Sequence, residues 1–357
     1  MALKHGDTIG IIGGGQLGRM LAIAAARLGF NTVVLDPQEN APAFQCANER
    51  IVAAYDDNEA LDDLAQRSDA VTYEFENVNV AAIRNLESSL PCHPNAKALS
   101  TSQDRLIEKQ FFNDLGIETA PFFDITSMKD FNQALSKLNN RGILKTRRMG
   151  YDGKGQVRVS LEDPNGLKVA RELVSSFPCI LEGYIEFVSE ISIIAARGTN
   201  GTVKAFELGE NVHRDGILHT TTIPAEISDA TTKDAHAIAA KVLGALDYVG
   251  VIGIEFFVMD DGGLIANEYA PRVHNSGHWT EAACTVSQFE QHIRAIAGLE
   301  LGDPANHSNC IMQNLIGDEV QMSDEILARP NTLLHLYGKS ESRPGRKMGH
   351  FTTIAKK

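Results

Sequence analysis

The sequence lacks the features that mark several specialised classes of protein. Its 357 residues contain no apolar run of about 18 residues, the length that a membrane-spanning helix needs. Its five cysteines are scattered and form no Cys-x-x-Cys pair, which argues against a disulfide framework and against a zinc site. Residues 1–7 lack the apolar core of a signal peptide. We therefore expect a cytoplasmic protein with no membrane partner.

Positive charge is also in deficit. Lysine and arginine number 33 against 46 aspartates and glutamates, so the net charge is −13, which argues against a general nucleic-acid binder. The deficit is uneven, because residues 339–357 carry six Lys or Arg and one Glu. This basic tail is either a solvated chain end or a local anion site.

Short apolar runs alternate with helical patterns in the first hundred residues, and this alternation predicts a mostly parallel sheet. The runs cover 8–12, 31–35, 50–53 and 70–73, and the helical patterns cover 17–28, 58–66 and 80–86. Another helix is expected over 102–115. From 142 to 227 short β-rich runs dominate, and the last fifty residues are β-rich again. The sequence therefore predicts a fold that combines α/β and α+β parts.

A glycine-rich turn, Gly13-Gly14-Gly15-Gln16-Leu17-Gly18, follows the first predicted strand and begins the first predicted helix. It fits the G-x-G-x-x-G pattern of dinucleotide sites, and Asp36 ends the next strand, where such sites place an acidic residue. Two interpretations remain open here. Either the turn binds a nicotinamide or flavin dinucleotide, or it belongs to a Rossmann-like domain that holds no dinucleotide.

A second glycine-rich segment, residues 150–156, lies between two predicted strands and lacks the GK[ST] of a Walker loop. Glycine-rich turns between antiparallel strands can cover nucleotide phosphates, as in kinases. Lys145, just before the segment, could contact a phosphate as a point charge. The alternative is an exposed hairpin with solvated lysines.

The strongest signal is a predicted hairpin with two acidic residues. Its apolar β-runs are residues 251–259 and 264–269. A four-residue loop pairs Met259 with Leu264, and this register places Glu255 opposite Glu268, with Cβ atoms about 4.5–5.5 Å apart. Facing carboxylates repel unless a cation lies between them, and oxygen ligands suit Mg²⁺ with nucleotide phosphates completing its shell. The alternatives are pairing of one carboxylate with Arg272, or a register shift of one residue.

Together these segments resemble the ATP-grasp superfamily, and within it the N5-carboxyaminoimidazole ribonucleotide synthetases. The matching segments are 13–20, 72–78, 104–109, 150–156, 267–278 and 343–350, so the resemblance spans nearly the whole chain. It implies a Rossmann-like preATP-grasp domain over 1–104 and an ATP-grasp region over 105–298, with a lid at about 121–187. A small β-rich C-terminal domain would cover 299–357.

The resemblance also implies a nucleotide site. The phosphates would be bound by Arg105, Lys145 and the lid residues Gly150, Tyr151, Asp152, Gly153, Lys154, Gly155 and Gln156. Adenine would lie at Glu182, Gly183, Tyr184 and Ile185, the ribose at Glu190, and the rest of the pocket at His213 and Asn267. Glu255 and Glu268 would hold Mg²⁺ or Mn²⁺, which agrees with the independent hairpin argument.

The implied reaction begins when bicarbonate attacks the γ-phosphate of ATP to give carboxyphosphate. CO₂ released from it is captured by the exocyclic amine of 5-aminoimidazole ribonucleotide. Arg272 and His274 are expected to bind bicarbonate, with Asp152 as the proton acceptor. Contacts with the ribonucleotide are expected from Glu74, Tyr151, Asp152, Arg272, His274, Asn275 and Ser276, and its phosphate would bind Lys339, Arg346 and Lys347. This would explain the basic tail.

Two positions depart from related patterns. Ala270 stands where many ATP-grasp ligases have a metal-binding Asn, which argues against biotin carboxylase and D-alanine ligase. Lys154 stands where relatives often have Arg, so a bidentate contact is lost. We expect no NAD and no biotin. The resemblance further implies a homodimer whose product passes to a mutase.

Three alternatives compete with this interpretation. Formate-dependent glycinamide ribonucleotide transformylase shares the lid and the hairpin and would use formate. A nicotinamide-dependent oxidoreductase rests on the 13–18 turn and Asp36 alone, and it leaves the paired glutamates unexplained. A nucleotide sensor would bind ATP without turnover.

Overall fold

The N-terminal part of the chain forms a parallel sheet. The structure, a computed structural model, describes residues 2–150 and 155–355. Strands β1 (Thr8–Ile12), β2 (Asn31–Asp36), β3 (Glu49–Val52) and β4 (Ala70–Tyr73) lie in the order β3-β2-β1-β4. The surrounding helices are α1 (Gln16–Arg27), η1 (Pro42–Gln45), α2 (Asn58–Gln66), α3 (Val80–Glu87) and α4 (Ala96–Ser102). The predicted parallel sheet is confirmed.

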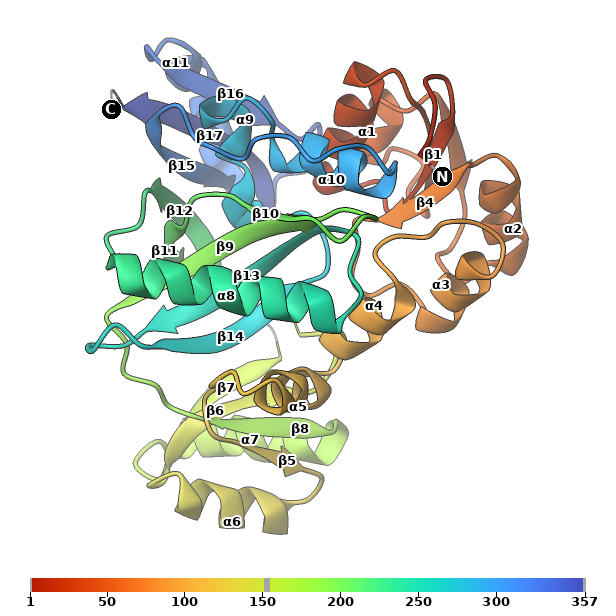
Figure 1. Cartoon of the computed structure of the whole chain (residues 1–357). Helices are drawn as coiled ribbons and strands as arrows, with labels where there is room; N and C mark the ends of the chain where they lie inside the picture. Colours follow the sequence, from red (N-terminus) through yellow and green to blue (C-terminus); the bar gives the residue numbers. More distant parts are fainter. Residues whose placement is uncertain (1, 151–154, 356–357) are drawn as a thin grey trace.

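A second, antiparallel sheet of four strands lies at the far end of the molecule from the two chain ends (Figure 1). Its strands β5 (Phe122–Ile125), β6 (Arg141–Thr146), β7 (Gln156–Ser160) and β8 (Cys179–Gly183) have the order β5-β8-β6-β7. Helices α6 (Met128–Lys137) and α7 (Pro164–Ser176) pack on it. We call this unit the lid sheet. Its strands and helices fall within the range 121–187 that the resemblance assigns to a lid.

The prediction of one helix over 102–115 is wrong in one respect. The helical conformation is interrupted after α4, and a separate helix, α5 (Arg105–Asp114), follows. Asp104 adopts an extended conformation there and caps α5, accepting a hydrogen bond from the Leu106 N–H at 3.1 Å. The Arg147 guanidinium donates to both carboxylate oxygens of Asp104, at 2.8 and 2.9 Å. The break therefore ties the start of α5 to the lid sheet.

The largest sheet has nine strands and includes the C-terminal part of the chain. The strands are β9 (Ser189–Arg197), β10 (Val203–Ala205), β11 (Gly209–Arg214), β12 (Ile217–Ile223), β13 (Gly250–Val258), β14 (Leu264–Ala270), β15 (Asn309–Ile316), β16 (Thr332–Leu336) and β17 (Lys347–Ala355). Their order is β14-β13-β9-β11-β12-β15-β17-β16, with β10 beside β9. The β-rich end thus continues the central sheet through the pairing of β12 with β15.

Helices cover the large sheet on both faces (Figure 1). They are α8 (Asp229–Ala245), η2 (Asn275–Gly277), α9 (Thr280–Ala283), α10 (Gln288–Ile296), η3 (Gly317–Met322) and α11 (Ser323–Leu327). Ala239 and Leu243 of α8 share one buried cluster with Ile252 and Phe256 of β13. A second cluster joins α10, α1 and Val251 across the other face. Each such large apolar side chain contributes about 1.5–3 kcal/mol when fully buried, so the N-terminal domain is firmly packed on the sheet.

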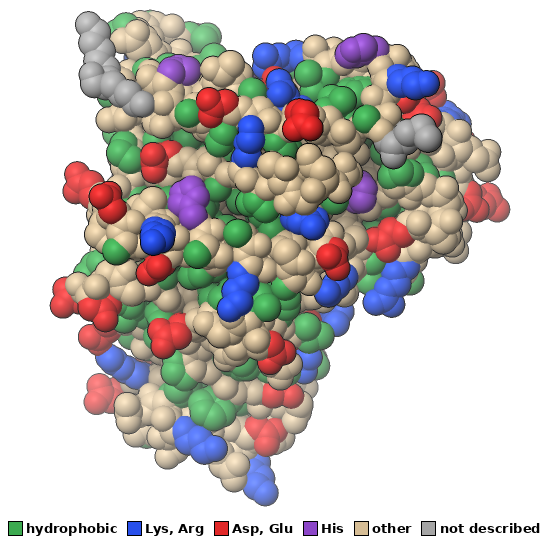
Figure 2. All heavy atoms as spheres, in the orientation of Figure 1, with side chains coloured by type: hydrophobic (Ala, Val, Ile, Leu, Met, Phe, Trp, Pro, Cys, Tyr) green, Lys and Arg blue, Asp and Glu red, His purple; other side chains and the backbone are tan. Residues whose placement is uncertain are grey.

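No helix in the described residues has both the length and the apolar character needed to span a membrane. On the face shown in Figure 2, acidic and basic side chains are interspersed and form no broad patch of one sign.

Candidate active site

The β13–β14 hairpin brings Glu255 and Glu268 together. The predicted pairing of these two residues is confirmed, but the predicted pairing of Met259 with Leu264 is wrong, because Val258 pairs with Leu264. A bulge between Glu255 and Phe256 then shifts the register by one residue. The bulge places Asn267 as an extra residue on β14 and so restores the facing carboxylates.

The two glutamates have different electrostatic surroundings. The Glu255 side chain is 13% exposed and the Glu268 side chain 41%. Burial, and then the charge of Glu268, raise the pKa of Glu255. Burial would also raise the pKa of Glu268, but Arg105, whose Nη1 lies 2.9 Å from Glu268 Oε2, outweighs it and lowers that pKa. The ion pair predicted as an alternative for Arg272 is therefore made by Arg105.

These carboxylates fit a divalent cation. They are two oxygen donors held opposite each other on a rigid hairpin, and Glu268 stays open to solvent, so a hydrated ion carrying phosphates could reach it. The repulsion that raises the pKa of Glu255 would be relieved by such an ion.

Two buried lysines that share one carboxylate lie near the hairpin. Lys145 on β6 lies 2.9 Å from Glu182 Oε2, and Lys109 on α5 lies 3.5 Å from the same oxygen. Lys109 Nζ also donates to the carbonyl of Asn267 at 2.6 Å. All three charged side chains are at most 10% exposed. Lys145, predicted for the phosphates, is thus linked through Glu182 and Lys109 to the bulge beside Glu268.

Sequence reasoning assigned no role to Lys109 or Glu108. Glu108 accepts a hydrogen bond from the Tyr269 N–H at 2.8 Å, and burial raises its pKa to about 8. A signal was available, because Arg105, Glu108 and Lys109 are spaced i, i+3 and i+4 and so share one face of a helix. Three charged residues on the face that packs against a predicted hairpin would have indicated a buried ionic site.

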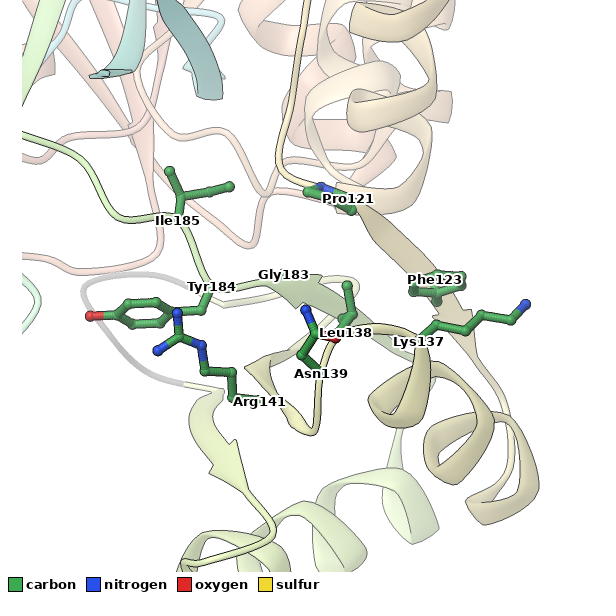
Figure 3. A pocket seen from close by; sticks show the side chains of 9 residues that line it. All are labelled: Pro121, Phe123, Lys137, Leu138, Asn139, Arg141, Gly183, Tyr184 and Ile185. Carbon is green, nitrogen blue, oxygen red and sulfur yellow. The ribbon is translucent and has the colours of Figure 1, made fainter. Parts of the chain in front are cut away.

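The segment predicted to bind adenine begins at the end of β8. The Glu182 side chain faces the lysines, and the strand ends at Gly183, whose N–H donates to the Pro121 carbonyl at 2.7 Å. A cavity of about 310 Å³ borders Gly183, Tyr184 and Ile185, and Figure 3 shows the Tyr184 ring beside the Arg141 guanidinium. The guanidinium carbon lies 5.1 Å from the ring centroid. The Tyr184 side chain thus borders this cavity with the Arg141 guanidinium against its ring.

Glu190 and His213 lie together on neighbouring strands of the large sheet. His213 Nδ1 is 2.9 Å from Glu190 Oε2, and β9 pairs with β11 at this point. Burial opposes protonation of His213, but the carboxylates of Glu190 and Glu255 outweigh it and raise its pKa. The residues predicted for the ribose and the pocket wall are therefore in contact and electrostatically linked to the glutamate pair.

The loop after the hairpin meets the N-terminal domain. Arg272 Nη2 lies 2.9 Å from Glu76 Oε2, in the segment after β4. His274 Nε2 lies 3.6 Å from Glu255 Oε1, and its Nδ1 is 2.8 Å from the Ser276 hydroxyl. Burial, and then Arg272, lower the pKa of His274 to about 3, so this imidazole is neutral at pH 7. The loop therefore places a neutral imidazole beside Glu255, with the cation Arg272 acting on that imidazole.

Gln288, which sequence reasoning missed, holds this loop in place. Its side-chain oxygen accepts from the His274 N–H at 2.9 Å, and its Nε2 donates to the His274 carbonyl at 2.7 Å. Gln288 is completely buried at the start of α10. Asn275 is also buried, and neither atom of its amide has a hydrogen-bond partner in the described residues. Nothing in the local sequence indicated the role of Gln288.

Two carboxylates of the N-terminal domain accept hydrogen bonds from the backbone N–H groups of its glycine turn. Asp36 accepts hydrogen bonds from the Gly14 N–H and the Tyr55 hydroxyl, both at 2.7 Å. Glu74 accepts from the Gly15 N–H at 3.0 Å, and burial raises its pKa. A Cβ on Gly13 would come within 2.7 Å of the Glu74 side chain. Asp36 therefore supports the turn, and Glu74, predicted to contact the aminoimidazole, lies directly over it.

The basic tail divides into two environments. Lys347 begins β17, and its charge acts on both Glu255 and His274. Lys339 Nζ donates to the Lys347 carbonyl at 2.7 Å. Arg346 instead donates to the Glu341 carbonyl at 2.8 Å, within its own exposed loop.

The two ends of the predicted glycine-rich lid segment, 150–156, contact α5 and β6. Gly150 accepts a hydrogen bond from Arg105 through its carbonyl at 3.4 Å, Gly155 precedes β7, and Gln156 begins that strand, opposite Lys145. Tyr151, Asp152, Gly153 and Lys154 lie outside the described residues.

The lid sheet, the facing glutamates and the buried lysines, carried on a chain with a Rossmann-like first domain, define the class of ATP-grasp ligases. The ATP-grasp domain family matches residues 110–289, the ribonucleotide synthetase preATP-grasp domain matches 6–103, and the phosphoribosylaminoimidazole carboxylase C-terminal domain matches 310–357. The chain belongs to the family of N5-carboxyaminoimidazole ribonucleotide synthases, which are ATP-dependent ligases of purine biosynthesis.

Individual relatives agree over almost their whole length. The N5-carboxyaminoimidazole ribonucleotide synthase of Brucella melitensis is 58% identical over 353 residues, covering 99% of this chain and 98% of the relative. A crystal structure of an N5-carboxyaminoimidazole ribonucleotide synthetase with ADP has a TM-score of 0.96 and 39% identity, covering 100% of this chain and 94% of the other. An Aspergillus clavatus synthase in complex with ADP and 5-aminoimidazole ribonucleotide has a TM-score of 0.92 and 31% identity, covering 98% and 94%. This family assignment excludes the oxidoreductase interpretation.

Proposed function

We propose that the chain converts ATP, bicarbonate and 5-aminoimidazole ribonucleotide into ADP, phosphate and N5-carboxyaminoimidazole ribonucleotide. The observation that carries the proposal is the pair Glu255 and Glu268, facing each other beside Arg105 and the Lys145–Glu182–Lys109 group. An enzyme that transfers a phosphoryl group needs such an arrangement of cations and metal-binding oxygens, whereas hydride transfer does not. The family supplies the acceptor, since the Aspergillus clavatus relative was crystallised with that ribonucleotide.

In the first step a bicarbonate oxygen attacks the γ-phosphorus, the bond to the β–γ bridging oxygen breaks, and ADP leaves. Glu255 and Glu268 would hold Mg²⁺ or Mn²⁺, which neutralises phosphate charge when bound. Arg105 and Lys145 orient the phosphates, with Gly150, Gly155 and Gln156 at the lid. Glu182 sets the positions of Lys145 and Lys109. Glu190, His213 and Asn267 line the ribose side, and the main chain of Tyr184 and Ile185 binds adenine.

In the second step carboxyphosphate breaks to CO₂ and phosphate, and the exocyclic amine of the ribonucleotide attacks CO₂ and loses a proton. Arg272 and the neutral His274 bind the bicarbonate and carboxyphosphate oxygens, because they present positive charge and a hydrogen-bond donor beside Glu255. Glu74, Asn275 and Ser276 contact the ribonucleotide, and Lys339, Arg346 and Lys347 bind its phosphate. We assign proton acceptance to Asp152 and further contacts to Tyr151, Gly153 and Lys154, which lie outside the described residues.

The proposal extends to the organisation of the protein. Residues 1–104 would supply the acceptor pocket, 105–298 the ATP site with its lid at about 121–187, and 299–357 the anion-binding end. We propose a cytoplasmic homodimer whose product is used by N5-carboxyaminoimidazole ribonucleotide mutase. Neither NAD nor biotin takes part.

The reaction predicts a strict dependence on two co-substrates. ADP release should require both bicarbonate and 5-aminoimidazole ribonucleotide, and labelled bicarbonate should enter an acid-labile nucleotide product. The measurement is ADP release with each combination of bicarbonate or formate and each ribonucleotide acceptor. Turnover with formate and glycinamide ribonucleotide would transfer the assignment to the transformylase, and ATP binding without any turnover would indicate a sensor.

The basic tail predicts a selective loss of ribonucleotide affinity. Lys347→Ala and Arg346→Ala should each lower the affinity for 5-aminoimidazole ribonucleotide by roughly 10- to 150-fold. The reason is that a charge-assisted phosphate contact contributes about 1.5–3 kcal/mol. ATP affinity should stay nearly unchanged. The measurement is the KM for each substrate, with Arg329→Ala as a matched control, since Arg329 lies over the Phe351 ring in the same domain. A fall in ATP affinity in the tail variants would show that the tail serves the other ligand.

A further inference from the structure

Three potential metal ligands meet in the C-terminal part of the molecule, outside the nucleotide site. Glu281 lies on α9, His335 on β16 and His350 on β17, and one ligand atom from each lies within 4.8 Å of the other two. His335 and His350 are directly paired across the two strands, and their rings stack with centroids 4.8 Å apart. Glu281 Oε2 lies 3.3 Å from His335 Nε2. Three separate elements therefore converge on one point.

The cluster contains a buried atom without a hydrogen bond. His350 is 1% exposed, and its Nε2 has no hydrogen-bond partner in the described residues. Its Nδ1 lies 2.8 Å from the Tyr337 hydroxyl. If Nδ1 carries the proton and donates a hydrogen bond to the Tyr337 oxygen, Nε2 is left with a lone pair that no hydrogen-bond donor in the described residues contacts. Histidines that bind a metal through one ring nitrogen commonly donate the proton of the other to such an oxygen, and a buried nitrogen left without a partner is unfavourable.

The two histidines of the cluster are in the form that binds metals, whereas burial leaves Glu281 only partly ionised near pH 7. Burial raises the pKa of Glu281 to about 7, and burial lowers the pKa values of His335 and His350, so both imidazoles are neutral at pH 7. Neutral imidazoles and a carboxylate are the forms that bind metals. A bound cation would favour the ionised form of Glu281.

An ion could reach the cluster from the surface. His335 is 27% exposed in its side chain and lines a cavity of about 220 Å³ together with Arg19, Leu334 and Tyr337. Glu281 and His350 do not line this cavity, and Glu281 Oε2 and His335 Nε2 are buried, so an ion would enter past the His335 ring. Arg19 lines the same cavity and donates hydrogen bonds to the Pro42 carbonyl and to Gln45. These acceptors are neutral, so its positive charge opposes an incoming cation on this side.

We propose that Glu281, His335 and His350 bind one divalent transition-metal ion, with Zn²⁺ as the ion of best fit and water as a fourth ligand. Two imidazoles and one carboxylate form a known zinc ligand set, whereas Mg²⁺ prefers oxygen alone. Ligand atoms about 2 Å from a tetrahedral zinc are roughly 3.3 Å apart, the separation that Glu281 and His335 already have. The sequence argument against a zinc site rested on the scattered cysteines, and the proposed site uses none of them.

The test uses Co²⁺ as a spectroscopic probe on the full chain, after treatment with a chelator and in excess Mg²⁺ to occupy the glutamate pair. Tetrahedral Co²⁺ with nitrogen ligands absorbs visible light far more strongly than octahedral Co²⁺ with oxygen ligands. We expect a band that saturates at one equivalent and that Zn²⁺ removes. His335→Gln and Glu281→Gln should each weaken Co²⁺ binding by at least roughly 10- to 100-fold.

Two control variants separate this site from other ligands. His236→Gln removes an exposed histidine on α8, and Glu268→Gln removes a carboxylate of the nucleotide site; both should keep the band. The proposal would be overturned if the wild type showed no band. It would also be overturned if the band survived both cluster substitutions or disappeared in Glu268→Gln.

A measurement on the wild type covers the case in which the cluster variants fail to fold. Diethyl pyrocarbonate modifies exposed histidines, and mass spectrometry locates the modified residue. Zn²⁺ should protect the partly exposed His335 and leave exposed His236 reactive. Equal reactivity of His335 with and without Zn²⁺ would exclude its role as a ligand.

Discussion

Glu268→Gln should lower ATP turnover by about 100- to 1000-fold while the protein stays folded. The substitution keeps the shape of the side chain but removes the charge that faces Glu255 and pairs with Arg105. Losing one group that stabilises developing charge typically costs about 2.7–4 kcal/mol in the transition state. Glu255→Gln should also impair turnover. The measurement is the kcat for ADP formation at saturating substrates over a range of Mg²⁺ concentrations.

Asp261→Asn is the matched control for this prediction, because it removes a carboxylate charge at the exposed tip of the same hairpin. It should leave kcat unchanged. Thermal unfolding and circular dichroism establish that all three variants fold. If both glutamate variants kept near-normal Mg²⁺-dependent turnover, the facing carboxylates would have no part in catalysis.

Glu182→Gln should cause the largest loss of stability, about 3–5 kcal/mol, which is the usual cost of breaking a buried ion pair by removing one partner. Glu182 is the carboxylate that Lys145 and Lys109 share, and its side chain is 4% exposed. Without its charge, two buried ammonium groups would face each other. The measurement is the free energy of unfolding from urea titration at pH 7, read at a signal from the lid sheet.

The pH dependence gives a second readout for this variant. Burial opposes ionisation of Glu182, but Lys109 and Lys145 outweigh it and lower its pKa to about 2. A carboxyl whose pKa falls on folding stabilises the protein above its unfolded pKa of about 4.3, and this contribution is lost as the pH falls through the folded value. The difference between wild type and Glu182→Gln should therefore be constant near pH 7 and shrink below about pH 4.

The control for Glu182 is Glu186→Gln, four residues further along. Glu186 pairs with Arg141 at 2.6 Å, but these side chains are 74% and 55% exposed. An exposed pair contributes about 0–1 kcal/mol, so its loss should change stability little. Equal stability of the two variants would contradict the view that Glu182 holds Lys145 and Lys109 in place.

Much of the architecture was readable from local patterns. The strands over 8–12 and 70–73 and the helix over 58–66 have the predicted limits. In these elements the deciding residues are near neighbours in sequence, so apolar periodicity and turn residues are sufficient. A short loop likewise places Glu255 and Glu268 on neighbouring strands, but they face each other only because a bulge offsets the register by one residue.

Other features depended on contacts between distant segments. The bulge at Asn267, whose carbonyl accepts from Lys109, is a property of the packed α5 helix as well as of the hairpin. The pairing of β12 with β15 makes the C-terminal strands part of the central sheet, which no local pattern indicated.

The same limit applies to the site. Glu268 meets Arg105 across 163 positions, and Glu281 meets His335 only because α9 packs near the paired strands β16 and β17. Periodicity records which face of an element is apolar, but not which element will cover that face. The ionic partners of a buried charge are therefore chosen by tertiary packing, where the cost of leaving the charge unpaired is highest.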